Sequence, residues 1–147
     1  MSEGKIEGVI SGWEAALEKK DVEKALSFVA EDAVWFTNEG TFKGKQEWKR
    51  YLTWMWKNIA DAKFNEAGIG VMVKGNKAVS QYTLEGKTTD GMRFEVPGVC
   101  LYEFKDEKIQ QHTTILDRLL LAKQAVKGIA AKRLVGSVVN RLERGLR

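Results

Sequence analysis

Apolar residues at the start of the chain recur at helical spacing. They lie three or four positions apart, and they are Ile6, Val9, Ile10, Trp13 and Leu17. This spacing predicts an amphipathic helix whose opposite side carries Glu14, Glu18, Lys19 and Lys20. Asp21 is a favourable N-cap residue, so a second short helix is expected to begin directly after it.

A short apolar run at 33–36 predicts a strand, which the polar stretch 38–40 ends. A third helix is predicted after Gly44, because an apolar stripe follows that consists of Trp48, Leu52, Met55 and Ile59. Trp54 and Trp56 lie off this stripe. We therefore expect these two rings to cover another surface, shield a rim or enter a cavity.

From about residue 63 the pattern changes to long strands separated by tight turns. The strands are predicted at 64–73, 78–87, 92–104 and 108–116, and the turns at 74–76, 89–91 and 105–107. Pro97 lies inside one strand, where it marks a bulge, a bend or an edge position because proline cannot donate a ladder hydrogen bond. The succession predicts a meander that curls.

The tail 118–147 is predicted to be helical in two parts, with Gly128 and Gly136 weakening it. It holds eight Lys/Arg and one acid, whereas residues 1–117 hold 16 Lys/Arg and 19 Asp/Glu. Its apolar stripe consists of Val135, Val138, Val139, Leu142 and Leu146. We expect this basic helix to dock on its own domain or on a dimer mate. A membrane surface is the second expectation, and nucleic acid is not expected, because the body is acidic and the tail has no aromatic residue.

Length and composition indicate one ordinary globular domain. The chain has 147 residues, of which 44% are hydrophobic and 30% charged. A single cysteine and a single histidine exclude an intramolecular disulfide and a Cys or His metal cluster, so no metal site is expected. The first residues lack the pattern of a signal peptide, and no apolar run approaches the roughly 20 residues of a membrane span. A cytoplasmic protein is expected.

Several motifs in a fixed order resemble the SnoaL-like and ketosteroid-isomerase-like members of the nuclear transport factor 2-like superfamily. They are Trp13-Glu-Ala-Ala-Leu17, Asp21, the stretches 25–35 and 40–45, Asp90-Gly91, the strand 99–104, and the sequence from Lys108 through His112 to Asp117. The resemblance covers about residues 5–125. It implies an α+β fold with a cone-shaped, curled antiparallel sheet packed on the N-terminal helices, in one domain spanning 1–147 with a helical extension from about residue 118. It also implies an apolar cavity and a homodimer formed through the open sheet face.

Matching residues to the family narrows the chemistry that the resemblance implies. The tyrosine and aspartate of ketosteroid isomerases correspond to Trp13 and Thr37, neither of which replaces them, so isomerase chemistry is not expected. SnoaL-like cyclases place an acid/base aspartate at the position of Asp117, with His112 upstream. The implied reaction needs no cofactor: a carboxylate removes a proton alpha to a carbonyl of a small apolar ligand. The competing hypothesis is a non-catalytic binding or interaction domain.

Each candidate residue has a structural alternative. Asp117 precedes a helix start and is a natural N-cap. His112 lies five positions earlier, so in a regular strand the two side chains point to opposite faces, and the histidine could lie on the outer face. The predicted ligand-binding aromatics could instead be plain core; they are Trp13, Trp35, Trp54, Tyr82 and Tyr102. Glu85 and Glu103 would rival Asp117 if they faced inward.

Overall fold

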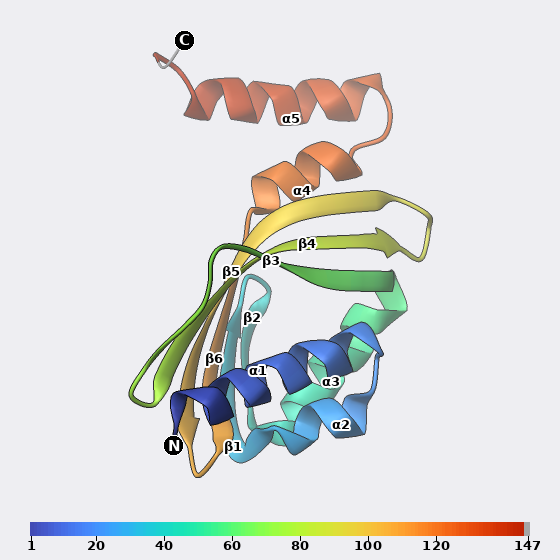
Figure 1. Cartoon of the computed structure of the whole chain (residues 1–147). Helices are drawn as coiled ribbons and strands as arrows, with labels where there is room; N and C mark the ends of the chain where they lie inside the picture. Colours follow the sequence, from blue (N-terminus) through green and yellow to red (C-terminus); the bar gives the residue numbers. More distant parts are fainter. Residues whose placement is uncertain (146–147) are drawn as a thin grey trace.

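The computed structural model describes residues 1–145. Three helices and two short strands come first, and they are α1 (Glu3–Glu18), α2 (Val22–Ser27), β1 (Val29–Thr37), β2 (Gly40–Lys43) and α3 (Gly44–Asn58). Four long strands follow, β3 (Ile59–Lys74), β4 (Lys77–Thr88), β5 (Arg93–Lys105) and β6 (Lys108–Leu116), and the chain ends in α4 (Arg118–Ala125) and α5 (Ile129–Leu142). Figure 1 shows a strongly curled sheet with α1, α2 and α3 on its concave side.

The six strands form one sheet in the order β2-β1-β6-β5-β4-β3. Neighbouring strands are antiparallel except for β1 and β6, which pair in parallel through Trp35 opposite His112. The predicted antiparallel meander therefore holds for β3 to β6, and a parallel pair attaches the N-terminal hairpin to it. The sheet does not close into a barrel, because β2 and β3 are its two edges.

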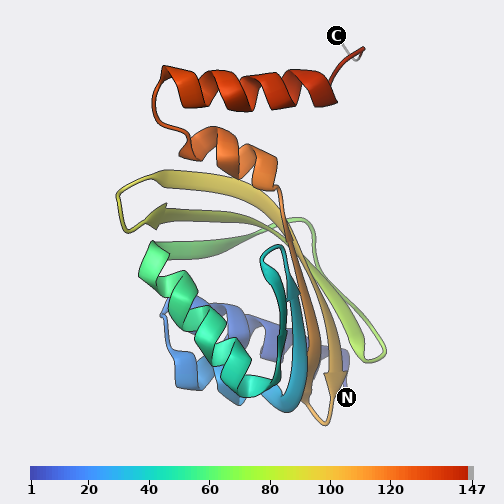
Figure 2. The ribbon, with the colours of Figure 1, turned by 180° about the vertical axis from the view of Figure 1, so that it is seen from behind.

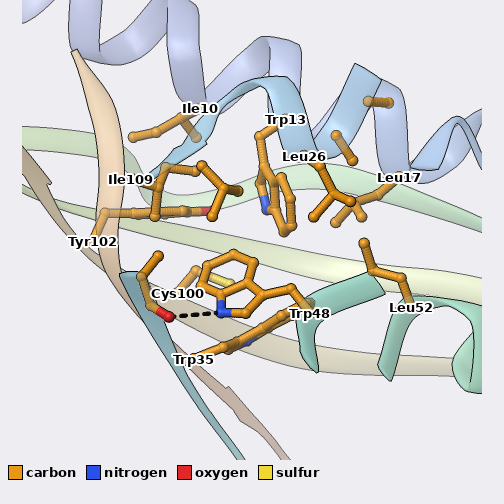
Figure 3. Packing of buried hydrophobic residues seen from close by; sticks show 14 of the residues in the cluster. Ile10, Trp13, Leu17, Leu26, Trp35, Trp48, Leu52, Cys100, Tyr102 and Ile109 are labelled. Carbon is orange, nitrogen blue, oxygen red and sulfur yellow. Dashed lines mark hydrogen bonds between the residues drawn. The ribbon is translucent and has the colours of Figure 1, made fainter. Parts of the chain in front are cut away.

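Alternation along the strands separates the two faces of the sheet. In β4 the buried positions are the even-numbered residues from Ala78 to Leu84, and in β5 they are those from Phe94 to Phe104. These side chains meet the apolar faces of α1 and α3 and build one core, part of which appears in Figure 3. Glu85 and Glu103 fall at odd positions and lie on the outer face. Neither of them is therefore an inward-facing carboxylate.

Pro97 lies where β5 becomes an edge. Pairing of β5 with β6 begins at Gly98 opposite Leu116, so the preceding part of β5 has no strand on that side. The Pro97 carbonyl accepts the Asp117 amide on this same side. Since the amide and carbonyl of one strand residue point the same way, the missing proline N–H faces no ladder partner. Of the three sequence interpretations, the edge position is the one observed.

The C-terminal helices extend beyond the sheet. Figure 1 and Figure 2 show α4 against the rim formed by β5, and α5 on the far side of α4. Of the apolar stripe predicted in this tail, Val139 is buried and Val135 half-buried, whereas Val138 and Leu142 are exposed; Leu146 lies outside the described residues. Within its own domain the stripe is therefore buried only at Val139 and in part at Val135, where α5 packs on α4, and docking on a dimer mate stays a prediction.

Candidate functional site

The concave interior, where the resemblance implied an apolar cavity, is filled with packed aromatic rings. Trp13 from α1, Trp35 from β1 and Trp48 from α3 are at most 3% exposed, and their ring centroids lie 4.8–5.6 Å apart. Figure 3 shows these three rings in contact, with the Trp48 indole N–H donating to the Ala33 carbonyl at 3.2 Å. Trp13 and Trp35, both predicted to bind a ligand, are thus part of the packed core, which was the alternative given for such residues.

His112 points into this aromatic interior. It is 1% exposed, and its ring contacts those of Trp13, Trp35 and Tyr102 at 5.7, 5.1 and 4.5 Å between centroids. A position on the outer sheet face, the alternative given above, is therefore wrong. Burial lowers the pKa of His112 to about 3, so the imidazole is neutral at physiological pH.

A short hydrogen-bond chain holds one nitrogen of His112. The Trp35 indole N–H donates to Thr114 Oγ1 at 2.9 Å, and the same hydroxyl lies 2.9 Å from His112 Nε2. The hydroxyl oxygen accepts from the indole and can either donate to Nε2 or accept a second hydrogen bond from it. Neither His112 Nδ1 nor the Tyr102 hydroxyl forms a hydrogen bond within residues 1–145, although both atoms are buried.

Tyr102 contacts this histidine, and Tyr82 and Cys100 are buried in the same core. Tyr82 Oη lies 3.3 Å from Cys100 Sγ. Burial raises the pKa of Cys100 to about 11 and raises the pKa of both phenols well above their usual value. All three groups therefore stay protonated at neutral pH. The two tyrosines predicted to bind a ligand thus lie together with His112 in the core.

Asp117 lies apart from this cluster. It is exposed, and its Oδ1 accepts the backbone N–H of Leu120 at 2.8 Å, which is the geometry of an N-cap for α4. The alternation of the strand separates it from His112, as the five-residue spacing indicated. The structure therefore shows Asp117 capping a helix at the surface, and its acid/base role stays a prediction.

An aromatic slot opens at the surface between the β1–β2 hairpin and α3. Phe42, Tyr51 and Trp54 form a row of nearly parallel rings, with centroids 4.4 and 5.7 Å apart and interplanar angles of 28° and 24°. Glu39 and Arg50 complete the lining of a cavity of about 170 Å³. We call this cavity the aromatic slot. Trp54 is 50% exposed at its rim, so a predicted ligand residue lies at this surface cavity.

The polar groups of the aromatic slot are already ordered. The Tyr51 hydroxyl donates to Glu39 Oε2 at 2.8 Å, and Arg118 Nη2 lies 3.7 Å from Glu39 Oε1. Burial, followed by the neighbouring Glu39, raises the pKa of Tyr51 above its usual value. Tyr51 also packs against Trp35 at 4.9 Å, so the slot adjoins the buried aromatic cluster.

Glu14 is a carboxylate that the sequence interpretation placed on the wrong side of α1. It lies in the partly buried layer between α1 and β4, where it accepts the Ser80 hydroxyl at 3.0 Å. Burial raises the pKa of this carboxyl, and the Ser80 hydrogen bond opposes the shift. The signal was present, because Glu14 follows Ile6 and Ile10 at intervals of four and so belongs to their stripe.

Two other features are absent from the described residues. Among residues 1–145, no group of three or more His, Cys, Asp or Glu side chains is arranged to hold a metal ion. Within the same residues, no helix has both the length and the apolar character needed to cross a membrane.

Comparisons with known proteins agree with this architecture. An NTF2-like protein of unknown function from Burkholderia pseudomallei superposes with a TM-score of 0.76 at 16% identity, covering 86% of this chain and 100% of that one. A putative SnoaL-like polyketide cyclase from Shewanella denitrificans gives 0.71 at 16% identity, covering 84% and 97%. A putative polyketide cyclase from Pseudomonas putida gives 0.71 at 19% identity, covering 80% and 96%.

The sequence itself places the chain in a family. No curated protein matches it closely enough to indicate a relationship. The family model of the SnoaL-like domain, however, matches residues 10–112, which run from α1 to the buried histidine of β6. This chain therefore belongs to the SnoaL-like domain family.

Proposed function

We propose that this chain binds a small, flat, largely apolar molecule bearing a carbonyl group in the aromatic slot. The observation that carries the proposal is Trp54, a half-exposed indole stacked on Tyr51 at the rim of a cavity. An indole so exposed gains little from core packing, and stacked aromatic faces favour a flat ligand. Two structural neighbours are named as putative polyketide cyclases, and this supports the choice of a carbonyl-bearing ligand.

The size and the polar lining of the slot limit the ligand. Its volume of about 170 Å³ is close to the roughly 150 Å³ of a protein cavity that holds benzene. The slot therefore suits one ring of a larger molecule whose remainder stays outside. Arg50 uses its guanidinium for two hydrogen bonds to Glu47, and since an arginine has five N–H donors, it keeps donors for a ligand carbonyl.

The proposal also assigns a catalytic role, in which Asp117 acts as the acid/base residue. Asp117 begins α4 beside the rim of the slot, because the next residue, Arg118, lies 3.7 Å from Glu39 and donates to the Asn38 carbonyl at 3.4 Å. A ligand that extends out of the slot would pass near this helix start. In this arrangement the Asp117 carboxylate would accept a proton alpha to the ligand carbonyl, and no cofactor would be required.

A binding experiment with a matched pair of probes tests the proposal. Acetophenone and ethylbenzene share a phenyl ring, and only acetophenone carries a carbonyl. Calorimetric titration is expected to show binding of acetophenone, loss of that binding in Trp54→Ala, and its retention in Phe36→Ala, which removes an exposed ring from the other face of the sheet. Equal binding by Trp54→Ala and the unmodified chain would place the ligand elsewhere and refute the slot assignment.

A second copy of the chain is the partner that we propose for the outer sheet face. Register places Met72, Val79, Leu101, Thr113 and Phe36 side by side across five strands. Three of them are large, apolar and exposed: Met72 at 55%, Leu101 at 44% and Phe36 at 39%. An uncharged row that crosses most of a sheet can pair with its own copy about a two-fold axis, which is the commonest symmetry of homodimers.

A further inference from the structure

Helix α5 carries an apolar stripe that is left exposed within residues 1–145. Leu134, Val138 and Leu142 are 69%, 47% and 70% exposed. They are four residues apart, so they line one side of the helix. The buried residue Val139 lies on the neighbouring side, where α5 packs on α4. Figure 2 shows α5 beyond α4 and away from the sheet.

A cationic surface adjoins this stripe on α5 and on the turn that follows it. Arg133, Arg141 and Arg144 line one shallow depression together with Gly136, Ser137 and Asn140. No acidic side chain takes part in this lining among the described residues. None of the three arginines forms an ion pair within residues 1–145. Three unpaired guanidinium groups with small polar neighbours form a surface that attracts phosphate groups.

We propose that α5 lies flat on the surface of an anionic lipid bilayer. The Leu134–Val138–Leu142 side would enter the boundary between headgroups and acyl chains, and the arginines would contact lipid phosphates. A basic amphipathic helix with exposed aliphatic residues binds such surfaces by apolar burial and by electrostatic attraction. The basic charge of the chain is also concentrated here, because residues 118–147 hold eight Lys/Arg and one acid.

Two other occupants fit the observations less well. A second copy pairing through α5 alone would use a helix of 14 residues, about 21 Å long, and the stripe of three side chains falls far short of the roughly 800 Å² per partner of a stable interface. Nucleic acid would engage the arginines and leave the aliphatic stripe in water. A bilayer surface engages the apolar stripe and the adjoining arginines at once.

Vesicle flotation with the full chain tests this proposal. Vesicles of phosphatidylcholine alone and of phosphatidylcholine with phosphatidylserine serve as probes. We expect the chain to float with the anionic vesicles and to be released by salt in part. Replacing the three arginines by glutamine should lower the partition coefficient about fivefold for each charge removed. Leu134→Gln and Leu142→Gln should each lower it about tenfold, through loss of apolar burial.

A charge-matched control separates a specific surface from general attraction. Lys63, Lys74 and Lys105 are exposed cations on the body of the domain, and their replacement by glutamine should leave vesicle binding nearly unchanged. The substituted residues of α5 are exposed, so circular dichroism melting should be unchanged in every variant. Equal flotation of all variants, or no flotation of the unmodified chain, overturns the proposal. A change of oligomeric state by the leucine variants without vesicle binding would assign the stripe to a second copy instead.

Discussion

The side-chain amide of Gln124 pairs with both backbone groups of Glu95. The Glu95 N–H donates to Gln124 Oε1 at 2.9 Å, and Gln124 Nε2 donates to the Glu95 carbonyl at 2.8 Å. Glu95 lies in the part of β5 that is not paired with β6. One glutamine of α4 therefore satisfies the open strand edge much as a residue of another strand would, and holds α4 against the sheet.

Replacement of this glutamine should loosen α4. Gln124→Ala removes both hydrogen bonds and leaves the Glu95 backbone groups to water, so we expect a loss of about 1 kcal/mol in the free energy of unfolding. The corresponding drop in melting temperature is about 2–4 °C. Lys123→Ala changes the exposed neighbour on the same helix and serves as the control. An equal effect of both substitutions on thermal melting would show that the Gln124 pairing contributes nothing specific.

Substitutions at Asp117 separate helix capping from catalysis. Asn caps a helix nearly as well as Asp, whereas Asp117→Ala should cost about 1 kcal/mol of stability. Asp117→Asn is therefore expected to keep the melting temperature within a few degrees, about 4 °C at most. If the chain turns over a carbonyl substrate by the proposed route, the same variant abolishes turnover. Unchanged turnover in Asp117→Asn would remove the residue from the reaction.

The buried imidazole of His112 should make the fold sensitive to acid. Its pKa is about 3 in the folded chain and 6.5 for the free side chain, so the unfolded state takes up the proton first. Stability is therefore unaffected by this group above pH 6.5 and is lost as the pH falls from 6.5 towards 3. The loss is about 1.4 kcal/mol for each pH unit in that range.

The measurement is urea unfolding at pH 7 and pH 5 for the unmodified chain and for His112→Gln. Glutamine does not titrate, so the variant should lose about 2 kcal/mol less between the two pH values. The test compares how much stability each protein loses between pH 7 and pH 5, so it remains informative if His112→Gln is less stable at both pH values. Parallel slopes would contradict a neutral, buried histidine.

The proposed dimer can be tested at the centre of the apolar row. Leu101→Glu places a charge amid uncharged neighbours, so it should convert a dimer into a monomer in sedimentation velocity. Ile129→Glu, at a residue 74% exposed on α5, changes the surface equally and should leave the dimer intact. A monomeric unmodified chain would contradict the proposed assembly directly.

Most of the fold could be predicted from periodicity and turn residues. Asp21 caps α2 through the Lys24 amide as expected, and the predicted turns fall between the observed strands of the meander. What the pattern could not give was the parallel contact of β1 with β6, because Trp35 and His112 are far apart in the sequence. The inward position of His112 depends on that contact and on the register shift between β5 and β6.

The candidate site was predictable only in part, for identifiable reasons. Trp54 was expected at a rim or a cavity because it lies off the apolar stripe of α3, and it lines the aromatic slot. Glu39 lies in a hairpin, and nothing in its sequence neighbours indicates that the Tyr51 hydroxyl reaches it. The sequence interpretation placed Glu14 on the exposed side of α1 because the residue is charged, and gave its helical spacing less weight. Spacing fixes the side of the helix, and the Ser80 hydroxyl then makes partial burial tolerable.

The parallel pairing of β1 with β6 also governs how a nascent chain can fold. Trp35 finds its neighbour His112 only after nearly the whole sheet has been synthesised, so the N-terminal hairpin cannot complete its side of the core earlier. Such distant contacts carry a large loop-closure cost and slow folding. A truncated product that ends before β6 would leave the tryptophan cluster open to water, and it would be a substrate for chaperones and proteases rather than a partly active protein.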